Sequence, residues 1–155
     1  MKRELRRLIE ALEKYLTDEG YAPIAGRVFA YLLLSPKPVP LDDLVHELRV
    51  SKASASTETR RLERLGLVER VTRPRDRRAW YQMADDLADR LVDLRIEHVA
   101  GFRDLSRRMV RQLPARERSA LRPRLVAIAV VYGEMLQALE GMRKKGTRGA
   151  KVRAA

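Results

Sequence analysis

Apolar residues recur every three or four positions over most of this 155-residue chain, and that spacing is typical of amphipathic helices. The pattern predicts three helices before residue 50, at residues 2–18, 23–34 and 41–48. The second and third are separated by residues 35–40. We expect this segment to be a rigid connector, because three of its six residues are proline.

A fourth helix is predicted to begin at Ser51, since a serine side chain can accept a hydrogen bond from the first helical turn. Two short helices joined by a tight turn are typical of a helix-turn-helix. We expect the apolar stripe of this fourth helix to face inward, and it consists of Ala55, Thr59, Leu62 and Gly66, with Leu65 beside it.

Two short strands are predicted after the fourth helix, at residues 67–71 and 79–83, and we expect them to pair antiparallel. Residues 72–78 lie between them as a hairpin loop with five charges in seven positions. A helix-turn-helix followed by a β-hairpin is the order of elements in a winged helix.

The last third of the chain predicts long helices. Residues 85–113 contain no proline and carry a continuous apolar stripe, which indicates one helix of roughly 40 Å at about 1.5 Å per residue. Pro114 ends it, and Pro123 either kinks the next helix or starts a new one. Residues 125–142 are apolar nearly all round in their first half. We therefore expect a homodimer interface built from the first and last helices.

Together these elements predict a mainly α fold with a small β-hairpin wing. The winged helix-turn-helix lobe would be flanked by N- and C-terminal dimerisation helices. We expect four parts, an N-terminal dimerisation helix, a DNA-binding lobe, C-terminal dimerisation helices and a disordered basic tail, at residues 1–20, 21–84, 85–145 and 146–155.

The net charge of +12 is concentrated in two segments. Residues 51–78 carry nine basic and four acidic side chains, and residues 143–155 carry six basic and no acidic ones. The charges of the first 50 residues cancel. Concentrated positive charge favours a polyanionic partner, because each neutralised phosphate releases counterions.

Several classes of chemistry lack the residues they need. The chain has no cysteine, and its two histidines, His46 and His98, lack metal-ligand spacing. It has no phosphate loop, nucleophile elbow or cluster of catalytic carboxylates. We expect no enzyme activity, no metal and no cofactor. The longest apolar run, residues 125–132, is shorter than the about 20 residues of a membrane span. We therefore expect a cytoplasmic protein without a membrane partner.

The face of the fourth helix opposite the apolar stripe has the chemistry of a DNA-reading surface. Small hydroxyl residues let a helix enter the major groove and pair with base edges, whereas arginine pairs with guanine or phosphate. Lys52, at the positive end of the helix, suits a phosphate. The predicted contacts on this helix are Ser51, Lys52, Ser54, Ser56, Thr57, Arg60, Arg61 and Arg64.

The hairpin loop is the second predicted contact with double-stranded DNA. An arginine-rich hairpin tip can reach the adjacent minor groove, where narrow A·T-rich stretches concentrate negative potential. Asp76 is expected to be structural, pairing within the loop or with the recognition helix. The predicted contacts in the loop are Arg73, Arg75, Arg77 and Arg78.

Asp76-Arg77-Arg78-Ala79, after a helix-turn-helix and one strand, resembles the wing signature of the multiple-antibiotic-resistance regulator (MarR) family. Four further motifs resemble its glycine-betaine-synthesis regulator (GbsR) branch, namely Gly20-Tyr21, Gly26-Arg27-Val28, Ser51-Lys52-Ala53-Ser54-Ala55-Ser56 and Leu62-Glu63-Arg64-Leu65-Gly66-Leu67-Val68. The resemblance covers about residues 2–142. It implies a triangular homodimer with interleaved first and last helices. By position, it implies that Arg78 meets the minor groove and that six residues of the fourth helix meet the major groove: Ser51, Lys52, Ser54, Ser56, Thr57 and Arg60.

The resemblance also implies that a small-molecule effector could act from a pocket between the lobe and the dimerisation helices. Tyr15, His98 and Phe102 could line that pocket, although a histidine in an apolar stripe is more often an interior residue. The leading hypothesis is a transcriptional repressor or activator that binds a pseudo-palindromic operator. The alternatives are a non-specific architectural nucleic-acid-binding protein and a winged-helix module that binds another protein.

Overall fold

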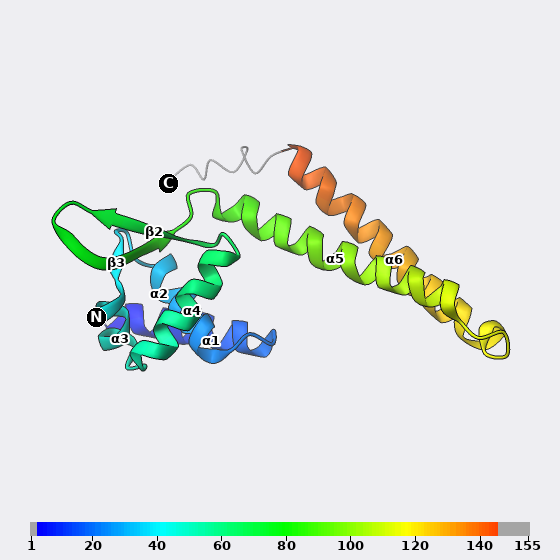
Figure 1. The fold of residues 1–155 in the computed structure, drawn as a ribbon, viewed down its shortest axis with the longest axis horizontal. Coiled ribbons are helices and arrows are strands. Elements are labelled where there is room, and N and C mark those ends of the chain that lie inside the picture. The colour runs from blue at the N-terminus through cyan, green and yellow to red at the C-terminus, as the bar shows by residue number, and fades with distance from the viewer. Residues whose placement is uncertain (1–2, 146–155) are drawn as a thin grey trace. The chain divides into compact units, whose positions relative to one another are not determined.

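The computed structural model of the protein describes residues 3–145, and backbone contacts divide the chain into two compact units, Met1–Leu87 and Ala88–Ala155. The disordered tail predicted at residues 146–155 lies outside the described residues. Within residues 3–145 the elements, labelled in Figure 1, are α1 (Arg3–Asp18), α2 (Pro23–Leu33), β1 (Val39–Pro40), α3 (Leu41–Leu48), α4 (Lys52–Arg64), β2 (Val68–Arg73), β3 (Asp76–Met83), α5 (Leu87–Gln112) and α6 (Arg118–Lys145). The predicted mainly helical fold with a small sheet is confirmed.

The connector predicted at residues 35–40 is wrong in its last two positions, which form strand β1. Val39 lies opposite Tyr81 and Pro40 opposite Trp80, so β1 pairs antiparallel with β3. Proline has no N–H to donate, which confines such a strand to a sheet edge. The order β1-β3-β2 places it there.

The hairpin is longer, and its loop shorter, than the sequence predicted. β2 and β3 extend to Arg73 and Asp76, which pair across the turn, so most of the predicted loop at residues 72–78 is strand. Two residues reverse the chain. Pro74 has its φ fixed by its ring, and Arg75 adopts a φ of 64°, a combination typical of a type II turn.

The core of the first unit lies between the helices and one face of the sheet. α2 supplies Val28 and Leu32, α3 supplies Leu44, and β2 supplies Val68, all fully buried. α1 packs along α2 at close range (Figure 1), because Gly26 has no Cβ. A Cβ at Gly26 would lie 3.3 Å from the Leu16 Cβ.

The second unit is a helical hairpin in which α5 and α6 run side by side (Figure 1). Val99 of α5 and Leu136 of α6 are buried, and Arg143 Nε lies 2.7 Å from Asp93 Oδ1. Pro123 lies inside α6 and does not start a new helix. By length and composition alone, Arg118–Lys144 could cross a membrane, and most of its apolar residues are not buried in this chain.

Candidate nucleic-acid interface

The residue that caps the start of α4 is Ser51, as the sequence predicted. The Ser51 hydroxyl accepts a hydrogen bond from the Ser54 backbone N–H at 3.0 Å, which satisfies one donor that the first helical turn leaves free. The same hydroxyl donates to the Ser54 Oγ at 2.8 Å. In this structure both hydroxyls are therefore engaged with one another at the start of the helix.

The two faces of α4 divide as predicted. Ala55, Thr59 and Leu62 are buried, and the Thr59 hydroxyl donates to the Ala55 carbonyl, so its polar group is satisfied inside the core. Leu65, predicted beside this stripe, is instead exposed, and Gly66, predicted within it, is half-buried beyond the helix, because the helix ends at Arg64 and the chain turns. On the opposite side, Lys52, Ala53, Thr57, Arg60, Arg61 and Arg64 are exposed, and Ser54 and Ser56 are half-buried.

The basic side chains of α4 differ in their partners. Lys52 Nζ lies 2.8 Å from Asp42 Oδ1, and Arg61 lies 3.8 Å from Glu58. Among the described residues, Arg60 and Arg64 have no ion pair or hydrogen bond. With Thr57 and Glu63 they line a shallow hollow on the outward surface. Arg60 and Arg64 are therefore the arginines of this helix most available to an external anion.

In the wing, Asp76 holds Arg78. Its carboxylate accepts hydrogen bonds from Arg78 Nη2 at 2.7 Å, from Arg78 Nε at 3.1 Å and from the Arg78 backbone N–H at 2.9 Å. These hydrogen bonds lower the pKa of Asp76 to about 2. Asp76 thus pairs within the wing, which was one of the two predicted alternatives.

Two wing arginines lie over the ring of Trp80. The guanidinium carbon of Arg73 lies 3.7 Å from the centroid of the Trp80 ring, and that of Arg78 lies 4.9 Å from it. Both distances are within the range of cation–π attraction. Trp80 is only 9% exposed, although it lies on the same hairpin as exposed arginines.

The four predicted wing arginines therefore fall into two pairs. Arg73 and Arg78 are oriented by Trp80 and Asp76. Arg75, at the turn, and Arg77 are exposed, and among the described residues neither has an ion pair or hydrogen bond. Sequence reasoning missed Trp80. The signal that could have found it is the two-residue spacing of Asp76, Arg78 and Trp80, which puts all three on one face once the strand begins at Asp76.

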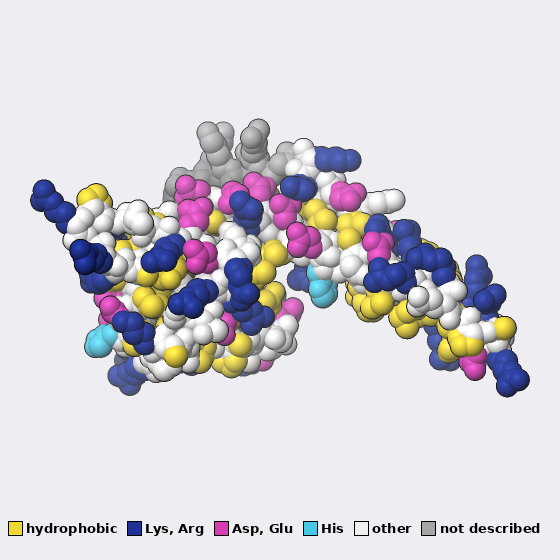
Figure 2. All heavy atoms as spheres, viewed as in Figure 1, with side chains coloured by type: hydrophobic (Ala, Val, Ile, Leu, Met, Phe, Trp, Pro, Cys, Tyr) yellow, Lys and Arg dark blue, Asp and Glu magenta, His cyan; other side chains and the backbone are white. Residues whose placement is uncertain are grey.

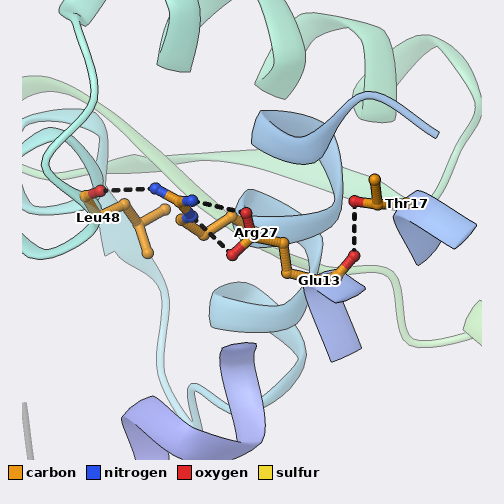
Figure 3. Close-up of polar contacts among 4 residues, drawn as sticks. All are labelled: Glu13, Thr17, Arg27 and Leu48. Carbon is orange, nitrogen blue, oxygen red and sulfur yellow. Dashed lines mark hydrogen bonds and ion pairs between the residues drawn. The ribbon is translucent and has the colours of Figure 1, made fainter. Parts of the chain in front are cut away.

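Hydrogen bonds of Arg27 join α1 and α2 to the end of α3, the first helix of the helix-turn-helix (Figure 3). Arg27 donates to both carboxylate oxygens of Glu13, at 2.6 and 2.8 Å, and to the Leu48 carbonyl at 3.4 Å. The bond to Glu13 raises the pKa of Arg27. Leu48 is the last residue of α3, and Arg49 follows it with a φ of 53°. One guanidinium thus connects α1, α2 and the turn that precedes α4.

The residues predicted for an effector pocket are divided between the two units. Tyr15 is exposed in the first unit. In the second, the Phe102 ring packs against Tyr132 with centroids 4.7 Å apart. The interior position expected of His98 is wrong, because its side chain is exposed. Within residues 3–145, no group of three or more His, Asp or Glu side chains could hold a metal ion.

Comparison with known proteins gives one family. The model of the MarR family matches residues 19–79, from the end of α1 to the middle of β3. No curated protein matches the chain. Among solved structures, the chain is similar to one described as a transcriptional regulator, with 23% identity, a TM-score of 0.72, and coverage of 89% of this chain and 94% of that one.

Two other solved structures are similar at lower TM-scores. AbsC, a MarR family transcriptional regulator from Streptomyces coelicolor, is 24% identical, with a TM-score of 0.43 and coverage of 90% of this chain and 89% of that one. S. aureus MepR in complex with DNA is 19% identical, with a TM-score of 0.42 and coverage of 86% and 91%. The family match and the structure at 0.72 identify the fold as a MarR-type winged helix.

Proposed function

We propose that this chain is a MarR-family transcriptional regulator that binds a pseudo-palindromic DNA operator as a homodimer, through α4 and the wing. The family match over residues 19–79 supports a DNA-binding winged-helix regulator and not an enzyme. The proposal goes further than that match in four respects: the branch within the family, the operator contacts, the dimer and any effector. We place the protein in the cytoplasm, where such a regulator meets DNA.

One observation carries the proposal. The outward face of α4 and the oriented wing arginines belong to the same compact unit and are both exposed. Thr57 and Arg60 are directed away from the buried stripe of Ala55 and Thr59. A helix with small residues at its entry and arginines farther along fits a major groove, and an arginine-bearing hairpin beside it fits the next minor groove.

Homodimerisation is supported by apolar surface left uncovered in the second unit. Val130 and Val131 are 54% and 52% exposed, and Ile128, Met135 and Met142 of the same helix are also exposed. A contiguous apolar surface on a helix is typical of a protein interface. Two winged-helix lobes held by such an interface would read half-sites about one helical turn apart.

The experiment is a selection of genomic fragments with the purified protein, followed by footprinting. We expect a protected region with two-fold symmetry. Arg60→Ala should weaken operator binding more than binding to random DNA, because Arg60 would pair with a base. Arg75→Ala should weaken both about equally, because Arg75 would contact only phosphate or the groove. Equal losses on all sequences for both variants would contradict the assignment of α4 as the reading helix.

Effector control through Tyr15, His98 and Phe102 stays a prediction. We propose thermal-shift screening of small cations, phenolic compounds and metals, since a ligand that binds the folded state raises its melting temperature. A ligand at this site should lose its effect in Tyr15→Ala and in Phe102→Ala. Because Phe102 packs against Tyr132, the second variant needs its own melting curve as a reference.

A further inference from the structure

The helical hairpin of the second unit carries its positive charge at one end. We define the hairpin tip as residues 103–124, which contain the end of α5, the turn and the start of α6. The tip carries eight arginines and two acidic residues, a net charge of +6. The rest of the hairpin, residues 88–102 and 125–145, carries five basic and five acidic residues and is neutral. Figure 2 shows dark blue side chains gathered around the end where α5 meets α6.

Little of this charge is compensated within the described chain. Arg103 pairs with Asp104 at 2.8 Å, and Arg118 donates to the Leu113 carbonyl at 3.3 Å. Arg107 and Arg108 are close enough to Asp104 to help lower its pKa. The remaining four arginines are exposed and, among the described residues, have no ion pair or hydrogen bond: Arg111, Arg116, Arg122 and Arg124.

The arrangement is unfavourable for the protein alone. Arg107 and Arg111 are four residues apart on α5, and Arg118 and Arg122 are four residues apart on α6, so like charges are neighbours on both helices. α6 has no acidic residue in its first turn, where a helix favours negative charge. An anion bound at the tip would reduce the repulsion between the arginines and would supply the negative charge that the start of α6 lacks.

The tip does not find its compensating negative charge on the opposite end of the hairpin in a second copy of the chain. That end is neutral overall, and its Asp93 is already paired with Arg143 at 2.7 Å. The compensating charge should therefore come from a different molecule with a high density of negative charge.

We propose that the hairpin tip is a second nucleic-acid-binding surface, which contacts the phosphate backbone of duplex DNA without reading its sequence. All eight basic residues of the tip are arginines, whose planar guanidinium pairs with phosphate through two hydrogen bonds. Duplex DNA presents one negative charge per about 1.7 Å of its axis, which suits a cluster drawn from two helices and a turn. This inference does not depend on α4 or the wing being an operator-reading surface.

An anionic membrane is the competing partner, because α6 is apolar along much of its length. Helices that lie in a membrane interface carry lysine and arginine on one face and tryptophan, phenylalanine or leucine on the other, and the aromatic residues anchor them most strongly at the boundary. Residues 103–124 contain no aromatic side chain, and the turn between the helices is made of leucine, proline, alanine, arginine and glutamate. The composition of the tip therefore favours nucleic acid.

The test compares two variants of the full chain that each lose two positive charges. Arg111→Gln/Arg122→Gln removes them from the tip, and Arg90→Gln/Arg95→Gln removes them from exposed positions of α5 outside the tip. Binding to a random-sequence 30-base-pair duplex is measured by fluorescence anisotropy across salt concentrations. For the tip variant, the slope of log affinity against log salt should become shallower by about 1.8, or about 0.9 per lost phosphate contact. Affinity at 0.1 M salt should fall at least about tenfold. The control should keep the wild-type slope.

Equal slopes for the two variants would overturn the proposal. It would also be overturned if the tip variant bound duplex as well as the wild type did but no longer bound phosphatidylserine vesicles that the wild type binds. Melting curves separate these outcomes from misfolding, because the tip variant should be at least as stable as the wild type when repulsion is removed. Failure of the proposed operator function would instead appear as equal losses of affinity for operator and random duplex in Arg60→Ala, with the tip effect unchanged.

Discussion

Asp76 and Arg78 form a closed pair on one face of β3, with Arg78 donating from its backbone N–H and from two guanidinium nitrogens to the same carboxylate. The pair limits the directions that the Arg78 guanidinium can take, and the Trp80 ring limits them further. Asp76 therefore orients the Arg78 guanidinium, although its negative charge lowers by one the positive charge that attracts DNA to the wing.

Asp76→Asn should separate orientation from charge. The substitution raises the net charge by one, so electrostatic attraction alone predicts tighter binding to every DNA. We expect operator binding to weaken, by about tenfold, because a neutral amide holds Arg78 less firmly than a carboxylate does. Binding to random duplex should stay the same or tighten. Titrations of both DNAs at one salt concentration provide the measurement, and tighter binding to both would contradict an orienting role.

The Asp76–Arg78 pair also predicts a pH dependence. The pKa of Asp76 is lowered from 3.8 to about 2, chiefly by its hydrogen bond with Arg78. A group whose pKa is lowered by folding contributes above its ordinary pKa, and the contribution is lost as pH falls through the folded value. The contribution of the pair to stability should thus be complete above about pH 4 and be lost between pH 4 and 2, while the carboxyl of the folded protein titrates with a midpoint near 2. NMR of the Asp76 carboxyl should show this, and Arg78→Ala should return its midpoint toward 3.8.

Trp80 gives a direct optical readout of the wing, because it is the only tryptophan in the sequence. A guanidinium close to the indole ring alters its fluorescence, so Arg73→Ala, which removes the group at 3.7 Å, should change emission more than Arg78→Ala at 4.9 Å. Arg77→Ala is the control, since Arg77 does not contact the ring. DNA that draws the arginines into a groove should change the wild-type emission in the same direction as Arg73→Ala. An Arg77→Ala spectrum equal to that of Arg73→Ala would mean that the change is not caused by contact.

The sequence predicted the helices well, because their burial follows a regular period. Ala55, Thr59 and Leu62 could be assigned to the core of α4 from spacing alone, and the Ser51 cap follows from its residue type. β1 could not be found in this way. It has two residues, one of them proline, and exists only because Val39 reaches Tyr81 of a distant strand.

The candidate site was predicted residue by residue on α4 but only partly in the wing. Placing Asp76 and Arg78 in a loop hid the two-residue period that aligns them with Trp80. The hairpin tip was missed for a different reason. Charge counted over residues 79–142 comes to +1, whereas folding α5 back on α6 gathers the arginines of residues 103–124 at one end. The link from Arg27 to Glu13 and Leu48 joins three helices, and no local pattern indicates it.

That link predicts a measurable contribution to stability. The Glu13 side chain is 15% exposed and that of Arg27 35%, so water screens the pair only partly. Glu13→Gln should lower the free energy of unfolding by about 1–2 kcal/mol, in the range of partly screened hydrogen bonds between charged groups. Lys14→Ala, which breaks the exposed pair between Lys14 and Asp18, should cost less than about 0.5 kcal/mol. Urea denaturation measures both, and equal effects would mean that the Arg27 pair is no stronger than a surface pair.

The last prediction concerns the exposed stripe of α6, in which Ile128, Val131 and Met135 follow one another at helical spacing. If this stripe is the homodimer interface, Val131→Arg places a charge in an apolar contact. Removing a charge from water without a partner costs several kcal/mol, enough to shift a dimer toward monomer by more than a hundredfold in dissociation constant. Glu140→Arg adds the same side chain at an exposed position half a turn around the helix from Val131 and should leave the mass unchanged. Sedimentation equilibrium gives the mass of each variant. The Val131→Arg monomer should also bind a single half-site with the wild-type preference but lose the affinity gained from pairing, whereas a Val131→Arg protein that remains a dimer would assign the interface to another surface.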